Sequence, residues 1–316
     1  MNARRGAKDL IGATRRWGLV GAFFLFCTFL ALATPSGTFL SGRNLVFVLL
    51  QISVNTILAS GMTMVILSKG IDLSVGSVVA LSGVVGADLV AQGWPVPLAA
   101  AVAIGIGALV GLVNGASIVY LRVAPFIATL AMMTAARGLA YLYTDGVSVG
   151  NLPEAFTVWG NGRIGPVPIP VLVAAVVVGG TAILLGRTVF GRRLYALGGN
   201  EEAARLAGVR VGRAKIVIYT LMGALAALGG ILLAARLGAG DPKAGQLFEL
   251  TAIAAVVVGG TSLAGGRGGV WGTVLGALII GVLDNGLVLM DVSAFWQMVV
   301  KGLVILGAVA LDRGRR

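Results

Sequence analysis

Long apolar runs separated by short polar stretches occupy most of the chain. A helix needs about 20 apolar residues to cross the hydrocarbon core of a membrane. The runs lack the alternation of apolar and polar positions that a lipid-facing strand shows, so we predict helices and not a barrel. The pattern therefore predicts an all-α fold, a polytopic helical bundle with about ten transmembrane helices. The predicted spans are 17–34, 45–68, 73–91, 96–121, 124–144, 168–186, 214–236, 246–263, 270–290 and 295–311.

The composition supports a membrane protein that performs no chemistry of its own. Hydrophobic residues make up 58% of the chain, charged residues only 11%, and the mean hydropathy is +0.98, which excludes a soluble fold. Ten spans leave no room for a soluble domain, so we treat residues 1–316 as one transmembrane domain and expect any energy source on another chain. Histidine is absent and Cys27 is the only cysteine, so we expect no metal site, cofactor, disulfide or catalytic residue here.

The basic residues set the predicted orientation. With the amino terminus in the cytoplasm, 18 of the 24 Lys and Arg residues fall on the inner side, as the preference of cytoplasmic loops for Lys and Arg requires. Both termini are therefore predicted to be cytoplasmic. The charge of +12 is explained by this topology, so we do not expect nucleic acid as a partner. The first span could imitate a cleaved signal peptide, but we expect a retained anchor.

One hydrophilic stretch interrupts the apolar chain, with nine charged residues in positions 187–215. Its centre, residues 199–208, predicts a short helix that Asn200 caps and that Gly208 ends in a left-handed conformation. Two glutamates suit the positive end of such a helix. Because a helix this short is marginal alone in water, we expect it to be stabilised in a cleft of a partner protein. The alternative is that it packs on its own bundle.

A second connection, residues 145–168, is predicted on the outer side. Its prolines and glycines indicate an ordered loop that does not span the membrane. It either meets an external partner or caps a pathway, or it is a plain connector between spans.

Glycines are concentrated at helical spacing within several spans. We expect them to allow close helix contacts inside one subunit and not to mark a dimer face. In the connection after the second span, Gly70 can end one helix, and Asp72 or Ser74 can cap the next. The glycines in question are Gly105, Gly107, Gly111, Gly115, Gly223, Gly229, Gly230, Gly272, Gly276 and Gly281.

Three motifs in order resemble one family of transport proteins. Residues 70–77 read GIDLSVGS, residues 197–204 read LGGNEEAA, and residues 258–269 contain VGGTS followed by GGRGG. Together they look like the permease subunit of ribose-type simple-sugar ABC importers, in the superfamily of branched-chain amino acid and ribose permeases. The Ile-Asp-Leu-Ser-Val form of the first motif favours the sugar branch. The similarity runs from about the second span to the carboxyl terminus.

This resemblance implies a type II ABC importer-like fold in the bacterial inner membrane. It makes residues 187–213 a cytoplasmic coupling loop, because Glu202, Ala203, Ala204 and Gly208 match the start of the coupling signature E-A-A-x-x-x-G. The Leu-Pro that commonly follows is replaced by Ile218-Tyr219-Thr220. The residues implied in contact with an ATPase are Gly199, Asn200, Glu201, Glu202, Ala203, Ala204, Arg205, Leu206 and Gly208.

The resemblance also implies partners. These are an ABC ATPase subunit that carries ATP and Mg, a periplasmic sugar-binding protein, and a second permease copy or a homologous permease, all within membrane lipid. The chain itself would be a transport subunit and not an enzyme, moving a ribose-like sugar by alternating access.

Polar residues inside spans are the candidates for the solute pathway, because such groups are costly in lipid and are normally paired or face water. Neutral amides and hydroxyls suit an uncharged, polyhydroxylated ligand. Asp284 and Lys301 are expected to pair with each other in preference to contacting a ligand. Asn55 and Asn285 are the strongest candidates, with interhelical hydrogen bonding as the competing role. The pathway candidates are Asn55, Ser60, Thr63, Asn114, Asn285 and Gln297, with Thr56, Thr129, Thr134 and Arg137 as further members.

Two other classes of protein are alternatives to the importer. An ion-coupled secondary carrier would need membrane carboxylates and no coupling loop, and only Asp284 fits that role. An intramembrane enzyme would need a catalytic constellation, which the sequence lacks. Within the importers, a branched-chain amino acid or a nucleoside is the alternative solute.

Overall fold

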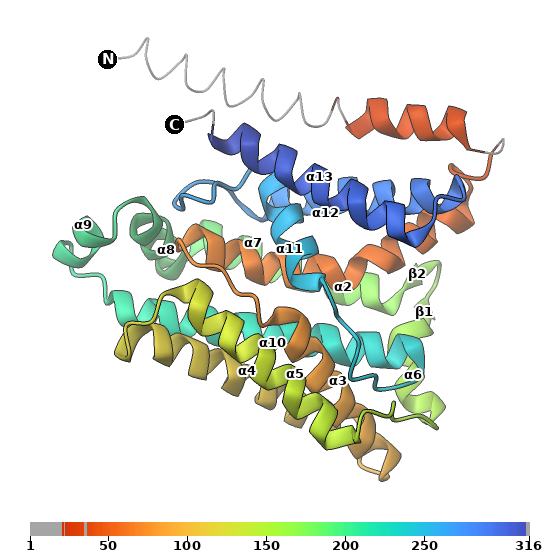
Figure 1. Cartoon of the computed structure of the whole chain (residues 1–316), viewed down its shortest axis with the longest axis horizontal. Helices are drawn as coiled ribbons and strands as arrows, with labels where there is room; N and C mark the ends of the chain where they lie inside the picture. Colours follow the sequence, from red (N-terminus) through yellow and green to blue (C-terminus); the bar gives the residue numbers. More distant parts are fainter. Residues whose placement is uncertain (1–20, 22, 35–36, 314–316) are drawn as a thin grey trace.

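The protein forms a bundle of long helices with one small hairpin (Figure 1). The computed structural model describes residues 21, 23–34 and 37–313. An apolar helix, Phe23–Ala33, comes first. The labelled helices are α2 (Gly42–Leu67), α3 (Val75–Ala91), α4 (Val96–Tyr120), α5 (Pro125–Thr144), α6 (Glu154–Asn161), α7 (Ile169–Arg187), α8 (Val189–Gly199), α9 (Glu201–Leu206), α10 (Val211–Leu237), α11 (Phe248–Val258), α12 (Val270–Leu289) and α13 (Ala294–Arg313). The strands β1 (Arg163–Ile164) and β2 (Val167–Pro168) pair antiparallel, Arg163 opposite Pro168.

The predicted apolar spans correspond to helices, although not all are long. Six helices are long and apolar enough to cross a membrane, namely α2, α4, α5, α7, α10 and α12, and four shorter apolar helices accompany them. The predicted span 246–263 was too long, because α11 ends at Val258 and a glycine-rich loop follows. The first predicted span, 17–34, begins outside the described residues. Both termini of the chain also lie outside them. The protein is thus a polytopic membrane bundle.

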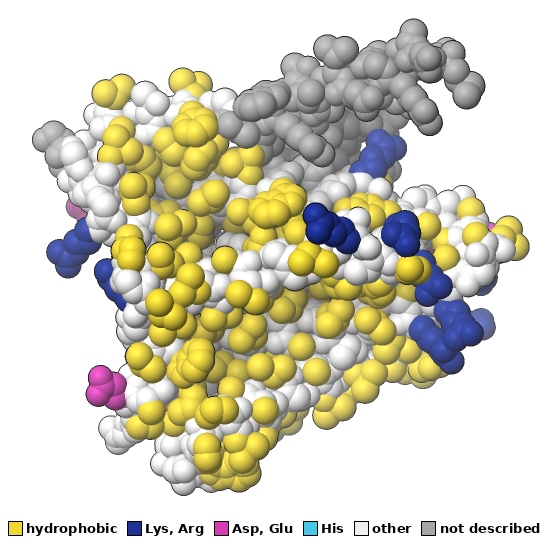
Figure 2. Space-filling view, turned by 180° about the vertical axis from the view of Figure 1, so that it is seen from behind, with side chains coloured by type: hydrophobic (Ala, Val, Ile, Leu, Met, Phe, Trp, Pro, Cys, Tyr) yellow, Lys and Arg dark blue, Asp and Glu magenta, His cyan; other side chains and the backbone are white. Residues whose placement is uncertain are grey.

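Helices α2 and α10 form the centre of this bundle. In their most apolar windows, 61% of α2 and 56% of α10 is buried, against 22% of α4 and 28% of α7. Both central helices are apolar on all sides, as expected for helices that are enclosed by others. The core around Ile57, Met62 and Met222 is fully buried. The outer helices turn large apolar side chains outward. Figure 2 shows hydrophobic side chains spread over one face of the molecule, with most Lys and Arg side chains toward one side of it.

The connection 145–168 is an ordered cap on one end of the bundle. Phe156 of α6 is 1% exposed and packs with α3, α4 and α10. The side chain of Asn161 donates hydrogen bonds to the carbonyl oxygens of Ala235 and Arg236, each at 3.2 Å. The prediction of an ordered loop that does not span the membrane is therefore confirmed.

Glycine contacts hold α4 against α10 backbone to backbone. A Cβ atom added at Gly111 would lie 2.1 Å from the carbonyl oxygen of Tyr219, and one at Gly223 would lie 2.1 Å from that of Gly107. The predicted close packing is confirmed for these residues. It is wrong for Gly105, which has nothing within 4 Å of an added Cβ, because it lies on the opposite face of the same helix.

Gly107 and Gly105 provide a matched test of this packing. In Gly107→Ala the new methyl group would meet the Gly223 carbonyl oxygen and the Ala227 Cβ, both at 2.5 Å. Overpacking of this kind costs about 1–3 kcal/mol, so the midpoint of thermal unfolding in detergent should fall. Gly105→Ala should leave the midpoint unchanged or raise it slightly, because alanine favours a helix by up to about 1 kcal/mol. Equal midpoints for the two variants would contradict the packing.

Candidate coupling surface and solute pathway

Helices α8 and α9 form an elbow at one end of the bundle, at the left of Figure 1. Thr188 caps α8 by accepting a hydrogen bond from the Gly191 amide at 3.2 Å. Asn200 caps α9 by accepting one from the Ala203 amide at 3.0 Å. Gly208 follows α9 with a φ of +82°. The predicted cap and the predicted left-handed stop are both found.

One side of α9 is fixed to the bundle of the same chain. Glu201 forms an ion pair with Lys215 of α10 at 2.9 Å, and Ala204 is 4% exposed. Lys69 also reaches the carbonyl oxygen of Gly199, at 3.4 Å. The bundle of the same chain therefore supplies an ion pair and a packed face to this short helix, as the alternative of packing on its own bundle predicts, and its stabilisation by a partner stays a prediction.

The other side of α9 is free to meet a second protein. Leu206 is 83% exposed, and the side chains of Glu202 and Arg205 are 69% and 61% exposed. Their mutual contact is long, at 4.0 Å, and a surface pair of this kind contributes little to stability. An exposed leucine between two opposite charges provides both apolar contact and charge for recognition.

The second and third sequence motifs meet beneath this elbow, against the residues just before the first motif. The amide of Gly266 in the third motif donates to the carbonyl oxygen of Leu67, at the end of α2, at 3.0 Å. A Cβ added at Gly198 in the second motif would lie 1.8 Å from that same oxygen and 2.5 Å from the Gly266 nitrogen. Lys69, next to the first motif, lies against Gly265. The elbow, α2 and the loop before α12 are therefore in direct backbone contact.

A tyrosine strengthens the same junction. The hydroxyl of Tyr195 in α8 donates to the carbonyl oxygen of Gly268 at 2.9 Å. Burial raises the pKa of the Tyr195 phenol above its usual value of 10.0, which keeps the hydroxyl protonated as this donor requires.

Asp72 of the first motif organises the connection between α2 and α3. Its Oδ1 accepts hydrogen bonds from the Ser74 amide at 2.9 Å and the Ser74 hydroxyl at 2.6 Å. Ser74 makes no side-chain capping bond, so Asp72 stabilises an Asx turn before α3 instead of a helix cap. Asn114, a predicted pathway residue, donates to the Ser74 hydroxyl at 2.9 Å and is 1% exposed.

Most other predicted pathway residues make hydrogen bonds within the chain. The hydroxyl of Ser60 bonds the Thr56 carbonyl at 2.8 Å, and that of Thr63 contacts Thr273 at 2.7 Å. The Gln297 amide donates to the Val292 carbonyl at 2.8 Å. Thr63 links α2 to α12, whereas Ser60 and Gln297 bond the backbone within or just before their own helices. The structure does not gather these groups into one opening.

The two strongest asparagine candidates differ from each other. Asn285 and Asn44 exchange two hydrogen bonds, at 2.9 and 3.0 Å, and so join α12 to α2. Asn44 is not among the pathway residues predicted from the sequence. In contrast, Oδ1 of Asn55 is buried without a hydrogen-bond partner in the described structure.

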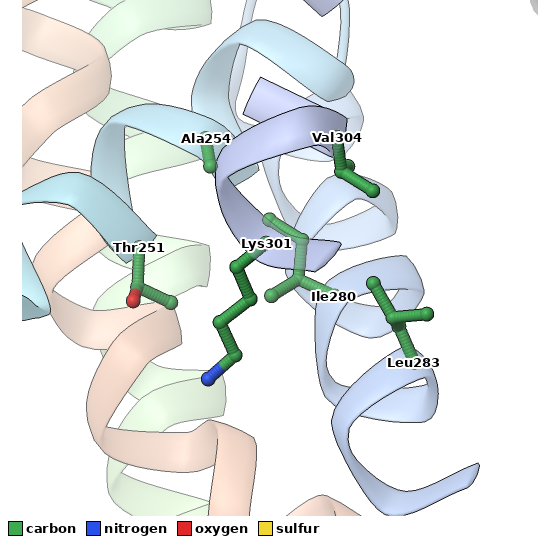
Figure 3. Close-up of a pocket in the computed structure, with 6 residues that line it drawn as sticks. All are labelled: Thr251, Ala254, Ile280, Leu283, Lys301 and Val304. Carbon is green, nitrogen blue, oxygen red and sulfur yellow. The ribbon is translucent and has the colours of Figure 1, made fainter. Parts of the chain in front are cut away.

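Asp284 and Lys301 are brought together between α12 and α13, with Lys301 Nζ 2.8 Å from Asp284 Oδ2. The other carboxylate oxygen of Asp284 is buried and has no partner among the described residues. Lys301 also lines a small hollow whose other walls are mainly aliphatic (Figure 3). Across the described ranges, no cluster of three or more His, Cys, Asp or Glu residues could hold a metal ion.

The apolar bundle, its glycine-packed core and the charged elbow define a polytopic membrane permease. Over residues 44–309 the chain matches the family described as "Branched-chain amino acid transport system / permease component", and it belongs to this family. It is a multi-pass protein of the inner membrane.

Relatives match the chain over most of its length. It is 46% identical to the ribose import permease protein RbsC of Bacillus subtilis over 304 residues, which cover 96% of this chain and 94% of the relative. It is 48% identical to RbsC of Escherichia coli K12 over 288 residues, 90% of each chain. The xylose transport system permease protein XylH of E. coli K12 is 39% identical, with 92% of this chain and 89% of the relative covered. No solved structure matches the chain.

The Asp284–Lys301 pair yields a stability prediction. Lys301→Met would leave a buried carboxylate without a partner, and this should cost about 1–3 kcal/mol and lower the unfolding midpoint in detergent. Asp284→Asn combined with Lys301→Met removes both charges, so part of the loss should return. A double variant no more stable than Lys301→Met would show that the two side chains do not interact.

Proposed function

We propose that this chain is the permease subunit of an ATP-driven importer that carries a ribose-like simple sugar by alternating access. The observation that carries the proposal is the elbow, with an exposed outer face on α9 and a rigid backbone junction behind it. The names of the relatives, two ribose import permeases and one xylose transport permease, support a simple sugar as the solute. The sugar branch of the family is therefore preferred to amino acid or nucleoside transport.

In this proposal the bundle crosses the membrane ten times, with both termini and the elbow in the cytoplasm. The six long and four shorter apolar helices support that number. The excess of Lys and Arg on the side of the elbow supports that orientation. The cap built from α6 and the β1–β2 hairpin would then face the periplasm, where a sugar-binding protein could dock.

The proposed partners provide what this chain does not. A nucleotide-binding subunit would hold ATP and Mg and contact Glu202, Arg205 and Leu206 on the outer face of α9. A periplasmic binding protein would deliver the sugar, and a second permease would complete the pathway. The function of this chain would be to convert movement of its elbow into a change of access.

The junction beneath the elbow suggests how such movement is transmitted. Gly198, Gly266 and the end of α2 at Leu67 touch through backbone atoms, so there is no side-chain rotamer between them to absorb displacement. A push on α9 would thus move α2, a central helix, and the loop that precedes α12. Both helices carry polar residues that the sequence analysis placed in the pathway.

Reversal of one charge on α9 tests the coupling role. The permease is reconstituted with its ATPase and its binding protein, and ATP hydrolysis stimulated by D-ribose is measured together with uptake. Glu202→Arg should lower both by about tenfold or more, because a charge reversed within an interface costs at least about 1.4 kcal/mol. The unfolding midpoint of the isolated permease should not change, since the Glu202 side chain is 69% exposed.

Asp291→Arg, the same reversal at an exposed residue between α12 and α13, is the control for a general effect of charge. Its stimulated hydrolysis should exceed that of Glu202→Arg. Full activity of Glu202→Arg would refute the coupling role of α9. Ribose uptake by the permease alone, driven by an ion gradient, would instead indicate a secondary carrier.

A further inference from the structure

A non-helical segment, residues 238–247, enters the bundle between α10 and α11. In Figure 1 it runs across the near face from the end of α10 to the start of α11. Gly240 lies against Ala87 near one end of α3, with an added Cβ 2.7 Å from the Ala87 Cβ, while Gly245 lies against Gly76 at the other end. Gly76 and Ala87 are eleven positions apart, which corresponds to about 16 Å along the axis of α3. The segment therefore reaches about halfway into a hydrocarbon core of about 30 Å.

Arg137 of α5 satisfies the exposed carbonyl groups of this segment. One of its guanidinium nitrogens donates to the carbonyl oxygens of Pro242, at 2.6 Å, and Ala244, at 2.8 Å. Irregular backbone at membrane depth is tolerated only where protein encloses it or where it lines a water-filled cavity. Arg137 is half-buried, so part of its side chain remains accessible beside the segment.

Glu249 occupies the point where the segment turns into α11. Its side chain is half-buried and lies within electrostatic reach of Arg137. A Cβ added at Gly76 would lie 2.4 Å from Glu249 Oε2 and 2.1 Å from the Gly245 carbonyl oxygen. Gly76 of the first sequence motif must therefore be glycine, because the segment and the Glu249 carboxylate cross α3 at this position. The coupling role of the elbow does not account for this residue.

Near Arg137, the middle of the membrane helix α5 presents a polar face. Thr134, Arg137 and Tyr141 lie at positions i, i+3 and i+7 of α5, on one side of the helix. Thr134 is exposed, as is Gln246 of the segment. Polar and charged groups at this depth normally face water or other protein and not lipid. By comparison, the middle of α7 presents Val176, which is 75% exposed, as a lipid-facing position should.

We propose that this face, formed by Thr134, Arg137, Gln246 and Glu249, is a contact site for a neutral polyhydroxylated solute midway along the pathway. The site offers donors from the guanidinium and the amide, and acceptors from the carboxylate and the hydroxyl. Arg137 and Glu249 carry opposite charges, so the site has no net charge that would favour an ionic solute. Interrupted helices near the membrane midplane are typical of such sites in transporters. The proposal rests on the proposed sugar-import function.

Access of water to this face can be measured independently of transport. In a Cys27→Ser background, Thr134→Cys and Val176→Cys are compared in the complete transporter in proteoliposomes, with and without ATP. A charged, membrane-impermeant methanethiosulfonate reagent should modify Thr134→Cys in at least one condition, while Val176→Cys keeps its free thiol. An unmodified Thr134→Cys in both conditions would overturn the proposal, as would equal modification of the two variants.

The contact itself is tested with Glu249→Gln, which preserves the size of the side chain. The negative charge near Arg137 is lost, while an amide that can donate and accept hydrogen bonds remains. D-Ribose uptake per ATP hydrolysed should fall several-fold while hydrolysis stimulated by the loaded binding protein persists. An equal loss of both, or a lowered unfolding midpoint, would assign Glu249 a purely structural role and overturn the contact. A wild-type transporter that fails to respond to D-ribose or D-xylose would instead refute the sugar-import function.

Discussion

Every backbone amide and carbonyl at membrane depth must find its partner within the protein, and this constraint shapes the whole structure. Helices meet it for most of the chain. Where a helix is interrupted, one polar side chain takes over the role: Asp72 before α3, Arg137 beside residues 238–247, and Tyr195 against the loop before α12. The charged and polar residues of this apolar protein are therefore found mainly at its interruptions.

Close helix packing depends on small residues. Gly107, Gly111 and Gly223 allow α4 to touch the backbone of α10, and the same kind of contact joins the elbow to α2. Rigid contact in the interior and at the elbow allows displacement at one end to move a central helix as a unit. The polar face on α5 lies apart from these rigid contacts, where the segment 238–247 replaces a helix. In the proposed mechanism, transmission of force is thus separate from contact with the solute.

The sequence was sufficient for the helical class, the approximate spans and the family, because apolar length and ordered motifs are local signals. It also indicated the Asn200 cap and the Asp284–Lys301 pair. It could not show that Asn114 and Asn285 bond to Ser74 and Asn44, since the partners lie 40 and 241 positions away. It assigned Asp72 a helix cap where the structure has an Asx turn. Hydropathy likewise counted residues 246–263 as one span, although the helix within them is short.

The contact of Gly198 with Leu67 and Gly266 has a consequence for how this protein responds to mutation. Most interfaces lose affinity when a side chain is truncated to alanine, but here each partner is already backbone, and alanine at Gly198 adds an atom. Alanine at Gly198 would therefore report a steric clash, whereas alanine scanning normally reports the loss of a favourable contact. Any side chain at Gly198 would disturb the attachment of the elbow, whereas a substitution on the exposed face of α9 leaves that attachment intact.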